Sequence, residues 1–400
     1  MSQSLEQIAQ KLVDSQKRVQ LMYAFNGTGK TRLSREFKEL VSPKEIDQEN
    51  QEEETKVKIM YYNAFTEDLF YWDNDLKGDL DRKLKIQSNR FTDWILADQG
   101  KGVDVIDNFQ YYSSKKITPR FNEQYTFKNR ENKNVTVKAY SEVTFSIESG
   151  DDDSLRNIKI SKGEESCFIW SVFYSLLDQV IEVLNTPEPD ERETDQFDEL
   201  EYVFIDDPVS SLDDTHLIEL AVNIATLIKS CQSDIKFIIT THNPLFYNVI
   251  YNELNNKDAR YNYKPKLEKY LLEKFDDGTL QLTNNQNDSP FSYHTHLLSI
   301  LKDVALSNNI EKFHFNLLRN ILEKTATFLG HKHWGNLITK TNLGDKEPYV
   351  KRILNASSHS KHSGEEANIV TTGDKLIFKR LVKEISSTYQ FNVDTEEIIL

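Results

Sequence analysis

No apolar segment of this sequence approaches the roughly 20 residues that a membrane-spanning helix needs, and only two of its 400 residues are cysteines. The first absence predicts a protein without a membrane partner. The second excludes a framework of disulfides, so Cys167 and Cys231 indicate a reducing compartment, and the cytoplasm is expected. Residues 1–18 lack the apolar centre and the small-residue cleavage site of an export signal, and they predict an amphipathic helix.

Charge is distributed unevenly along the chain. The formal net charge of −15 argues at first against a nucleic-acid partner, because phosphate binding requires a basic face. Residues 285–400, however, hold 14 Lys and Arg against 13 Asp and Glu, so the excess of acid lies before them. The same part contains seven of the nine histidines, and histidine is the side chain best suited to proton transfer near neutral pH. Acidity and candidate chemistry are therefore predicted in different parts of the chain.

The pattern of apolar residues divides the chain in two. In the first part apolar strands alternate with helical periodicity, which predicts an α/β domain around a mainly parallel sheet. Alternation within residues 123–147 predicts further antiparallel strands, and the aromatic, acidic segment 66–75 is expected to be a loop. The remainder is helical in pattern, so we expect an NTPase-type domain over residues 1–285 and a small, mainly helical domain over residues 286–400. Individual strands are predicted at residues 18–23, 57–65, 200–205 and 235–241, with a hairpin at 267–283 and a long helix at 162–185.

The strongest local signal is the run Ala-Phe-Asn-Gly-Thr-Gly-Lys-Thr at residues 24–31, which follows a predicted strand and opens a predicted helix. In that position glycines let backbone N–H groups turn toward phosphate, and the helix N-terminus adds its positive dipole. Lys30 is expected to reach the β- and γ-phosphates, and Thr31 to ligate Mg²⁺. The alternative is a glycine-rich turn that only caps a helix. The residues expected to contact the nucleotide are Asn26, Gly27, Thr28, Gly29, Lys30 and Thr31.

Polar groups also follow three further predicted strands. The position of Asp206 suits it to hold Mg²⁺, and Asp207 is placed to polarise the attacking water. Most ATPases of the ATP-binding-cassette type have glutamate at the position of Asp207. The shorter side chain of Asp207 therefore predicts slow hydrolysis. His242 follows another strand and is expected to meet the γ-phosphate. No glutamine loop is evident, and Asn63 or Glu67 is the candidate for that position. Each residue alone is commonly structural, but their order along the chain favours an NTPase.

Residues 160–165, Ile-Ser-Lys-Gly-Glu-Glu, resemble the signature of ATP-binding-cassette (ABC) NTPases, and residues 208–213 resemble their D-loop. In that family the signature serine and the following helix cap the nucleotide bound by the other subunit. By resemblance Ser161 and Gly163 contact nucleotide, and the composite site implies a homodimer or a higher homo-oligomer. Simple capping of a helix is the alternative. The expected nucleotide is ATP, with GTP and dTTP as alternatives, together with Mg²⁺.

Three side chains of the C-terminal part have the chemistry for metal-free RNA cleavage. Arg319 and Glu323 are four residues apart in a predicted helix and hence on one face, and His359 follows one helix later. An arginine that holds phosphate, with a carboxylate and an imidazole that transfer protons, suffices for attack of a 2′-OH on its own phosphodiester, which DNA cannot undergo. The alternatives are an ordinary surface ion pair and, for the histidine pairs within residues 294–296 and 331–333, metal ligands.

The chain resembles the PrrC-type anticodon nucleases, bacterial tRNA-cutting toxins in which an ABC-type NTPase domain precedes a nuclease domain. The resemblance is carried by segments spread from end to end, among them YAFNGTGKTRLSR, YYNAFTEDLFYWDND, YVFIDDPVSSLDD and LLRNILEKTATFLG. The second of these, residues 61–75, is particularly specific, because common cassette ATPases have nothing like it.

The resemblance implies roles for individual residues. It makes Arg319, Glu323 and His359 the catalytic triad and assigns Asp288 and Ser289 to recognition of the anticodon. It also implies cleavage of lysine tRNA to 2′,3′-cyclic phosphate and 5′-OH ends, silencing by a type I restriction enzyme, and release when a phage disables that enzyme. The NTPase part would then act as a switch. Two other interpretations stay open, a cassette ATPase that clamps DNA in repair without nuclease activity, and a metal-dependent DNA nuclease.

Overall fold

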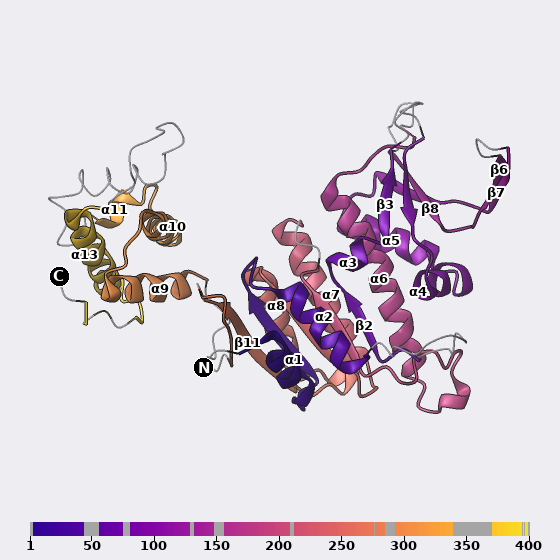
Figure 1. Cartoon of the computed structure of the whole chain (residues 1–400), viewed down its shortest axis with the longest axis horizontal. Coiled ribbons are helices and arrows are strands. Elements are labelled where there is room, and N and C mark those ends of the chain that lie inside the picture. Colours follow the sequence, from indigo (N-terminus) through magenta and orange to yellow (C-terminus); the bar gives the residue numbers. More distant parts are fainter. Residues whose placement is uncertain are drawn as a thin grey trace. The chain divides into compact units, whose positions relative to one another are not determined.

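The chain forms two compact units, Met1–Phe291 and Ser292–Leu400, in a computed structural model (Figure 1). The residues that it describes are 3–43, 56–74, 81–128, 132–147, 156–208, 212–275, 277–284, 293–338, 370–393, 395 and 397–398. The domain boundary expected at residue 285 lies outside these residues. Each unit is described below by itself.

The larger unit is built on a six-stranded sheet. Neighbouring strands are parallel, except for the final hairpin, whose two strands are antiparallel. Its strands in spatial order are β12 (Leu280–Asn284), β11 (Leu267–Lys274), β1 (Val19–Ala24), β10 (Lys236–Thr241), β9 (Tyr202–Asp206) and β2 (Ile59–Tyr62). The predicted mainly parallel sheet and its terminal hairpin are therefore confirmed. Because parallel strands end at the same edge, the segments that follow β1, β2, β9 and β10 all lie along one edge of the sheet.

Helices cover both faces of this sheet. On one face α1 (Leu5–Asp14) and α2 (Lys30–Val41) bury apolar side chains against Met22 and its same-face neighbours in other strands. On the opposite face lie α7 (Asp214–Ser230) and α8 (Pro244–Leu254), where Tyr247 packs edge-on to Tyr23 at a centroid distance of 5.8 Å. Met22 and Tyr23 point to opposite faces because side chains alternate along a strand. Burial on both faces explains why the central strands β1, β9 and β10 are largely apolar.

A second, antiparallel sheet of four strands belongs to the same unit. In spatial order its strands are β3 (Phe70–Asp73), β4 (Lys83–Ile86), β8 (Glu142–Ile147) and β5 (Ile117–Phe121). A separate ribbon pairs β6 (Tyr125–Lys128) with β7 (Asn134–Val137), so the antiparallel strands predicted within residues 123–147 are confirmed. The expectation of a loop over residues 66–75 was wrong for β3, in which Phe70 and Trp72 alternate with the more polar Tyr71 and Asp73. The shorter elements are α3 (Ala64–Glu67), α4 (Arg90–Asp93), a π-helical turn (Trp94–Asp98), α5 (Gly102–Tyr112) and two 3-10 turns (Pro189–Glu191 and Ala259–Tyr261).

The long helix α6 (Lys162–Leu184) joins the cores of the two sheets, and it confirms the helix predicted at residues 162–185. Its Phe168 packs against Phe145 of the antiparallel sheet (5.3 Å between centroids), and its Trp170 packs against Tyr62 of the parallel sheet (5.0 Å). By length and composition α6 could cross a membrane, contrary to the expectation from the sequence, but 83% of its most apolar window is buried inside the protein. This is the burial of a core helix.

Within the described residues of the smaller unit every regular element is a helix. These helices are α9 (Tyr293–Ser307), α10 (Lys312–Phe328), α11 (Gly335–Ile338) and α13 (Thr372–Thr388). Leu301, Leu318 and Phe378 are fully buried where α9, α10 and α13 meet in one hydrophobic core. The predicted helix beginning near residue 347 lies outside the described residues.

Candidate nucleotide and nuclease sites

Residues 24–31 run from the end of β1 through the connecting loop into the first turn of α2, at the edge of the parallel sheet where its strands end. Gly27 and Gly29 have φ angles of 82° and 102°, in the left-handed region that glycine adopts without strain. No atom lies within 4 Å of the point where a Cβ would stand on either residue. The loop therefore leaves open space beside its own backbone at the N-terminus of a helix, which is the form of a phosphate cradle.

Lys30 begins α2 and is almost fully buried. Its Nζ lies 3.0 Å from Oδ2 of Asp207. It also donates to two carbonyl oxygens of the loop (3.2 and 3.4 Å) and to Oδ1 of Asn26 (3.4 Å). The Thr28 hydroxyl donates to the carbonyl oxygen of Phe25 (2.7 Å) and thereby braces the turn. Lys30 is thus held from two directions, by oxygen atoms at the end of β1 and in the loop after it, and by Asp207, which follows β9.

Asp206, the last residue of β9, accepts a hydrogen bond from the Thr31 hydroxyl to Oδ2 (2.7 Å) and another from the Thr240 hydroxyl to Oδ1. Its carboxylate is buried, and burial raises its pKa, an effect that the two hydroxyl bonds oppose and the neighbouring charge of Asp207 reinforces. Thr31 and Asp206 therefore bring two hard oxygen donors together. This is the ligand chemistry that Mg²⁺ prefers, so the residues present fit that ion.

Asp207 has an unusual backbone conformation and close contacts to two residues of the sheet edge. Its φ of 52° is uncommon for a residue other than glycine. Its Oδ1 accepts from the backbone N–H of His242 (2.9 Å) and lies 2.7 Å from His242 Nδ1. Burial alone would raise the pKa of this carboxyl, but the hydrogen bonds from His242 and the charge of Lys30 together lower it. The structure thus keeps Asp207 ionised and oriented between a lysine and a histidine.

The end of β2 distinguishes the two candidates for the missing glutamine. Asn63 is buried and donates from Nδ2 to Oγ of Ser34 (2.9 Å), whose hydroxyl donates to the carbonyl oxygen of Thr31 (2.9 Å). Glu67 instead accepts from the Tyr62 hydroxyl (3.0 Å), and burial raises its pKa. Asn63 is therefore the residue connected to the phosphate loop, an assignment that spacing alone could not make.

The signature-like run lies at the start of α6. Ser161 is the N-cap and forms a reciprocal capping box with Glu164. Ser161 is exposed, and Gly163 is half-buried in the first turn. Lys162 pairs with Glu165 at 2.7 Å, and Glu165 also accepts from Nε1 of Trp72 in β3 (2.9 Å). The N-capping role, which was the alternative for this run, is present within a single chain. Residues 209–211 of the D-loop-like run lie outside the described residues.

Arg319 and Glu323 lie on one face of α10, as predicted. The Arg319 Nε donates to Oε1 of Glu323 at 2.8 Å, and the side chains are 22% and 47% exposed. The guanidinium also lies over the ring of Trp334, 5.9 Å from its centroid. The Trp334 ring thus lies against the Arg319 guanidinium, and both side chains of the pair remain accessible to solvent. Its predicted partners His359, Asp288 and Ser289 lie outside the described residues.

Two other histidines of this unit have structural contacts. Burial lowers the pKa of His294, a hydrogen bond with Asn320 of α10 opposes that shift, and the charge of Lys324 adds to it. His314 is buried at the start of α10, where its Nδ1 accepts from the backbone N–H of Glu311 (2.9 Å). The His294 contact therefore connects α9 to α10, and the His314 contact caps the start of α10.

Comparison with known proteins gives the family. A family model described as an AAA domain matches residues 121–376, more than half of the chain. An anticodon nuclease of Escherichia coli is 48% identical over 417 aligned residues, covering 98% of each chain. The chain belongs to the anticodon nuclease family. The predicted family is thereby confirmed, and for this anticodon nuclease homologue the AAA domain implies nucleotide binding.

Solved structures similar to this anticodon nuclease homologue are more distant. A structure of the Smc head bound to the C-winged helix domain of ScpA is 11% identical and covers 68% of this chain and 91% of its own, with a TM-score of 0.30. The SMC head domain from Thermotoga maritima gives the same identity and coverage with a TM-score of 0.27. Scores this low support no argument. The predicted α/β P-loop NTPase fold is established instead by the strand order, the glycine-rich loop and the AAA match.

Proposed function

We propose that this chain is a nucleotide-gated, metal-independent endoribonuclease that cleaves the anticodon loop of tRNA. By resemblance the substrate is lysine tRNA, and the products carry 2′,3′-cyclic phosphate and 5′-OH ends. The observation that carries the proposal is the Arg319–Glu323 pair, fixed at 2.8 Å and open to solvent in a member of the anticodon nuclease family. An isolated surface ion pair would have no such context.

The proposed reaction uses the ribose of the substrate as its nucleophile. The 2′-OH attacks the adjacent phosphorus, so that an O2′–P bond forms and the P–O5′ bond breaks. Arg319 holds the phosphate oxygens and stabilises their added charge, while Glu323 and His359 take the proton from the 2′-OH and give one to the leaving 5′ oxygen. Asp288 and Ser289 contact the anticodon. No proton or electron remains unaccounted for, and no metal is required.

The nucleotide site of the larger unit acts as the proposed switch. Lys30, with the loop residues Asn26, Gly27, Thr28 and Gly29, binds the phosphates of ATP, GTP or dTTP. Thr31 and Asp206 would hold Mg²⁺, which when bound neutralises phosphate charge. Asp207 orients the attacking water and His242 senses the γ-phosphate. A triphosphate that binds one conformation more tightly than another would shift the population of nuclease-competent molecules.

Association completes the proposal. Ser161 and Gly163 would cap a nucleotide bound by a second copy, which makes the working form a homodimer or a higher homo-oligomer. In the cytoplasm a type I restriction enzyme would keep the nuclease silent until a phage disables that enzyme, so the chain would serve as a toxin in phage defence. The support for these steps is the resemblance to the family and the placement of Ser161 at an exposed helix start.

Incubating the purified protein with total tRNA, with and without ATP, and mapping the cut ends tests the function directly. We expect one cut in an anticodon loop, a 2′,3′-cyclic phosphate at the 3′ end of the upstream fragment, and loss of cutting in His359→Ala with near-normal nucleotide binding. Any cutting that the protein shows without nucleotide should also survive EDTA. If EDTA abolishes it, a metal-dependent nuclease is indicated. If neither tRNA nor His359 matters, the chain is an ATPase of the DNA-clamping kind.

A further inference from the structure

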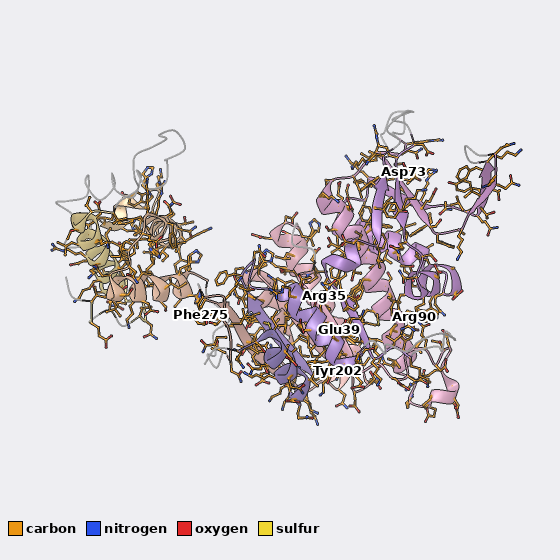
Figure 2. All side chains as sticks on the ribbon, viewed as in Figure 1. Arg35, Glu39, Asp73, Arg90, Tyr202 and Phe275 are labelled. Atoms are coloured by element: carbon orange, nitrogen blue, oxygen red, sulfur yellow. The ribbon has the colours of Figure 1, made fainter. Side chains whose placement is uncertain are left out.

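The antiparallel sheet has an inner face that packs on helices and an outer face that does not take part in that packing. Trp72 and Phe145 of the inner face contact each other, and Phe145 contacts Phe168 of α6. Tyr71 pairs directly with Lys85, and Lys85 pairs with Glu142, so these three residues share the opposite face. Tyr71 is 57% exposed on that face. Figure 2 labels Asp73, which lies on the same face two residues further along β3.

The β6–β7 ribbon continues this outer face. Every residue of β6 is exposed, including Tyr125 (36%) and Phe127 (46%), whose rings lie on one side of the ribbon with centroids 6.2 Å apart. The Tyr125 hydroxyl donates to Oε2 of the buried Glu142 (2.9 Å), and Lys83 lies over the Tyr125 ring. This contact ties the ribbon to the outer face of the sheet. Figure 1 shows β6 and β7 standing apart from the other strands of their unit.

The base of the ribbon is also fixed. Asn122 donates from Nδ2 to the carbonyl oxygen of Lys138 (2.7 Å) and accepts from the backbone N–H of Glu142 (2.8 Å). The two strands are joined further by the hydroxyls of Thr126 and Thr136, 3.2 Å apart. Exposed aromatic rings are therefore presented on a constrained scaffold rather than on a free loop.

Basic and acidic side chains both lie on this outer face. Arg120, Lys128 and Lys138 are exposed, whereas Lys83 and Lys85 are half-buried and paired with Glu142, Asp81 and Asp73. Exposed aromatic side chains bind unpaired bases by stacking, and neighbouring cations bind the phosphates between them. The exposed Lys128 and Lys138 favour this partner over a protein, because lysine is depleted in the cores of protein interfaces.

We propose that the outer face of the antiparallel sheet, with the β6–β7 ribbon, binds unpaired RNA. Bases stack on Tyr71 and Phe127. Phosphates are held by Arg120, which is on the outer face of the sheet like Tyr71, and by Lys128, whose side chain leaves the ribbon on the side opposite Phe127. Recognition by stacking is tolerant of sequence. This surface lies in the larger unit, separate from the Arg319–Glu323 pair, so it goes beyond the proposed cleavage and assigns a use to the distinctive segment at residues 61–75.

The test is the binding of a fluorescein-labelled oligouridine to the full chain, followed by anisotropy. The probe has no anticodon loop, so its binding does not depend on cleavage. We expect the double substitution Tyr71→Ser and Phe127→Ser to weaken binding by roughly tenfold or more. The matched control is Tyr111→Ser on α5, which removes a ring that is 50% exposed on a helix. It should leave binding unchanged.

Lys128→Glu provides a second variant that removes no packed group. It should weaken binding and lower the salt dependence of log K by about one unit. Equal binding by wild type, the double variant and the Tyr111 control would overturn the proposal. So would a loss of self-association in the double variant without a loss of RNA binding, which would make the face a protein interface. Failure of tRNA cleavage with retained oligouridine binding would count against the nuclease assignment alone.

Discussion

The ammonium group of Lys30 lies 3.0 Å from the carboxylate of Asp207, so the lysine expected at the phosphates and the carboxylate expected at the attacking water are partners of each other. A triphosphate that attracts Lys30 must therefore compete with Asp207. When Lys30 leaves, His242 remains the group that orients the carboxylate. Under the proposed roles, nucleotide binding and preparation of Asp207 for hydrolysis would be one exchange of partners.

Asp207→Asn should separate binding from hydrolysis. The amide cannot serve as a base, so hydrolysis should fall by about 10²–10⁴-fold, while nucleotide binding is retained because the glycine-rich loop is unchanged. Phosphate release and a nucleotide titration measure the two properties. Asp198→Asn is the control, since Asp198 is a carboxylate paired with Arg192 at 2.7 Å. Undiminished hydrolysis in the Asp207 variant would show that another group activates the water.

His242→Ala should move the pH dependence of hydrolysis. In the wild type the hydrogen bonds from His242 and the charge of Lys30 outweigh burial and keep the pKa of Asp207 low. Without His242 its hydrogen bonds no longer oppose the raising effect of burial, so the pKa of Asp207 rises and the low-pH limb of the rate profile shifts to higher pH. His216→Ala, which removes the partner of the exposed Asp213, is the control. A limb that stays in place contradicts the assignment.

Arg319→Lys should reduce tRNA cleavage by about 10²-fold or more even though the charge is kept. Lysine lacks the planar fork that pairs with Glu323 and stacks over Trp334. Nucleotide hydrolysis should not change. Cleavage assays on lysine tRNA check the effect, and Lys375→Ala, which removes a bond to the carbonyl oxygen of Asn308 in the same unit, is the control. Near-normal cleavage by the lysine variant would show that the Arg319–Glu323 pair is a surface contact without a role in cleavage.

Ser161 offers a way to separate helix capping from nucleotide contact. Ser161→Ala removes the cap and should cost about 0.5–2 kcal/mol of stability, whereas Ser161→Asp keeps a good N-cap. If Ser161 also faces a second subunit's nucleotide, the aspartate variant should remain stable and still lose hydrolysis by charge repulsion. Thermal unfolding and phosphate release, measured together, give both quantities. A stable aspartate variant with full activity would leave capping as the whole role.

Leu318→Ala tests the core of the smaller unit. Leu318 is fully buried on α10, so its truncation should cost about 2–5 kcal/mol. Phe328→Ala is the control, because that ring is 91% exposed. Denaturant unfolding should show the loss for the leucine variant and little for the phenylalanine variant. The comparison also shows whether a cleavage defect at Arg319 could arise from lost folding.

How far the sequence predicts the structure depends on whether the signal is local. Gly27 and Gly29 occupy left-handed backbone positions, and Asp206 and His242 follow buried strands, so the nucleotide edge could be located without coordinates. The pairing of Lys30 with Asp207 could not, because it depends on the order of β1, β10 and β9 in space.

Other features also needed tertiary partners. The strand β3 was mistaken for a loop because only four residues alternate between acidic flanks, and its inner side is defined by the packing of Phe70 on Phe168 of α6. Asn63 and Glu67 are equivalent by spacing, and only the bond to Ser34 distinguishes them. In the smaller unit the four-residue spacing predicted that Arg319 lies beside Glu323. It could not predict the contact with the ring of Trp334, which comes from a later segment of the chain.

Helix α6 imposes a constraint on how this chain can change. Phe168 packs among rings of the antiparallel sheet, and Trp170, two residues on, packs on Tyr62 at the edge that carries the phosphate loop. A substitution in α6 that improves its packing on one sheet is expected to rotate or shift the helix, and so to disturb its packing on the other sheet. Variation in its interior should therefore be tolerated mainly in compensated combinations, and an engineered attempt to retune the nucleotide edge from this helix must redesign two interiors at once.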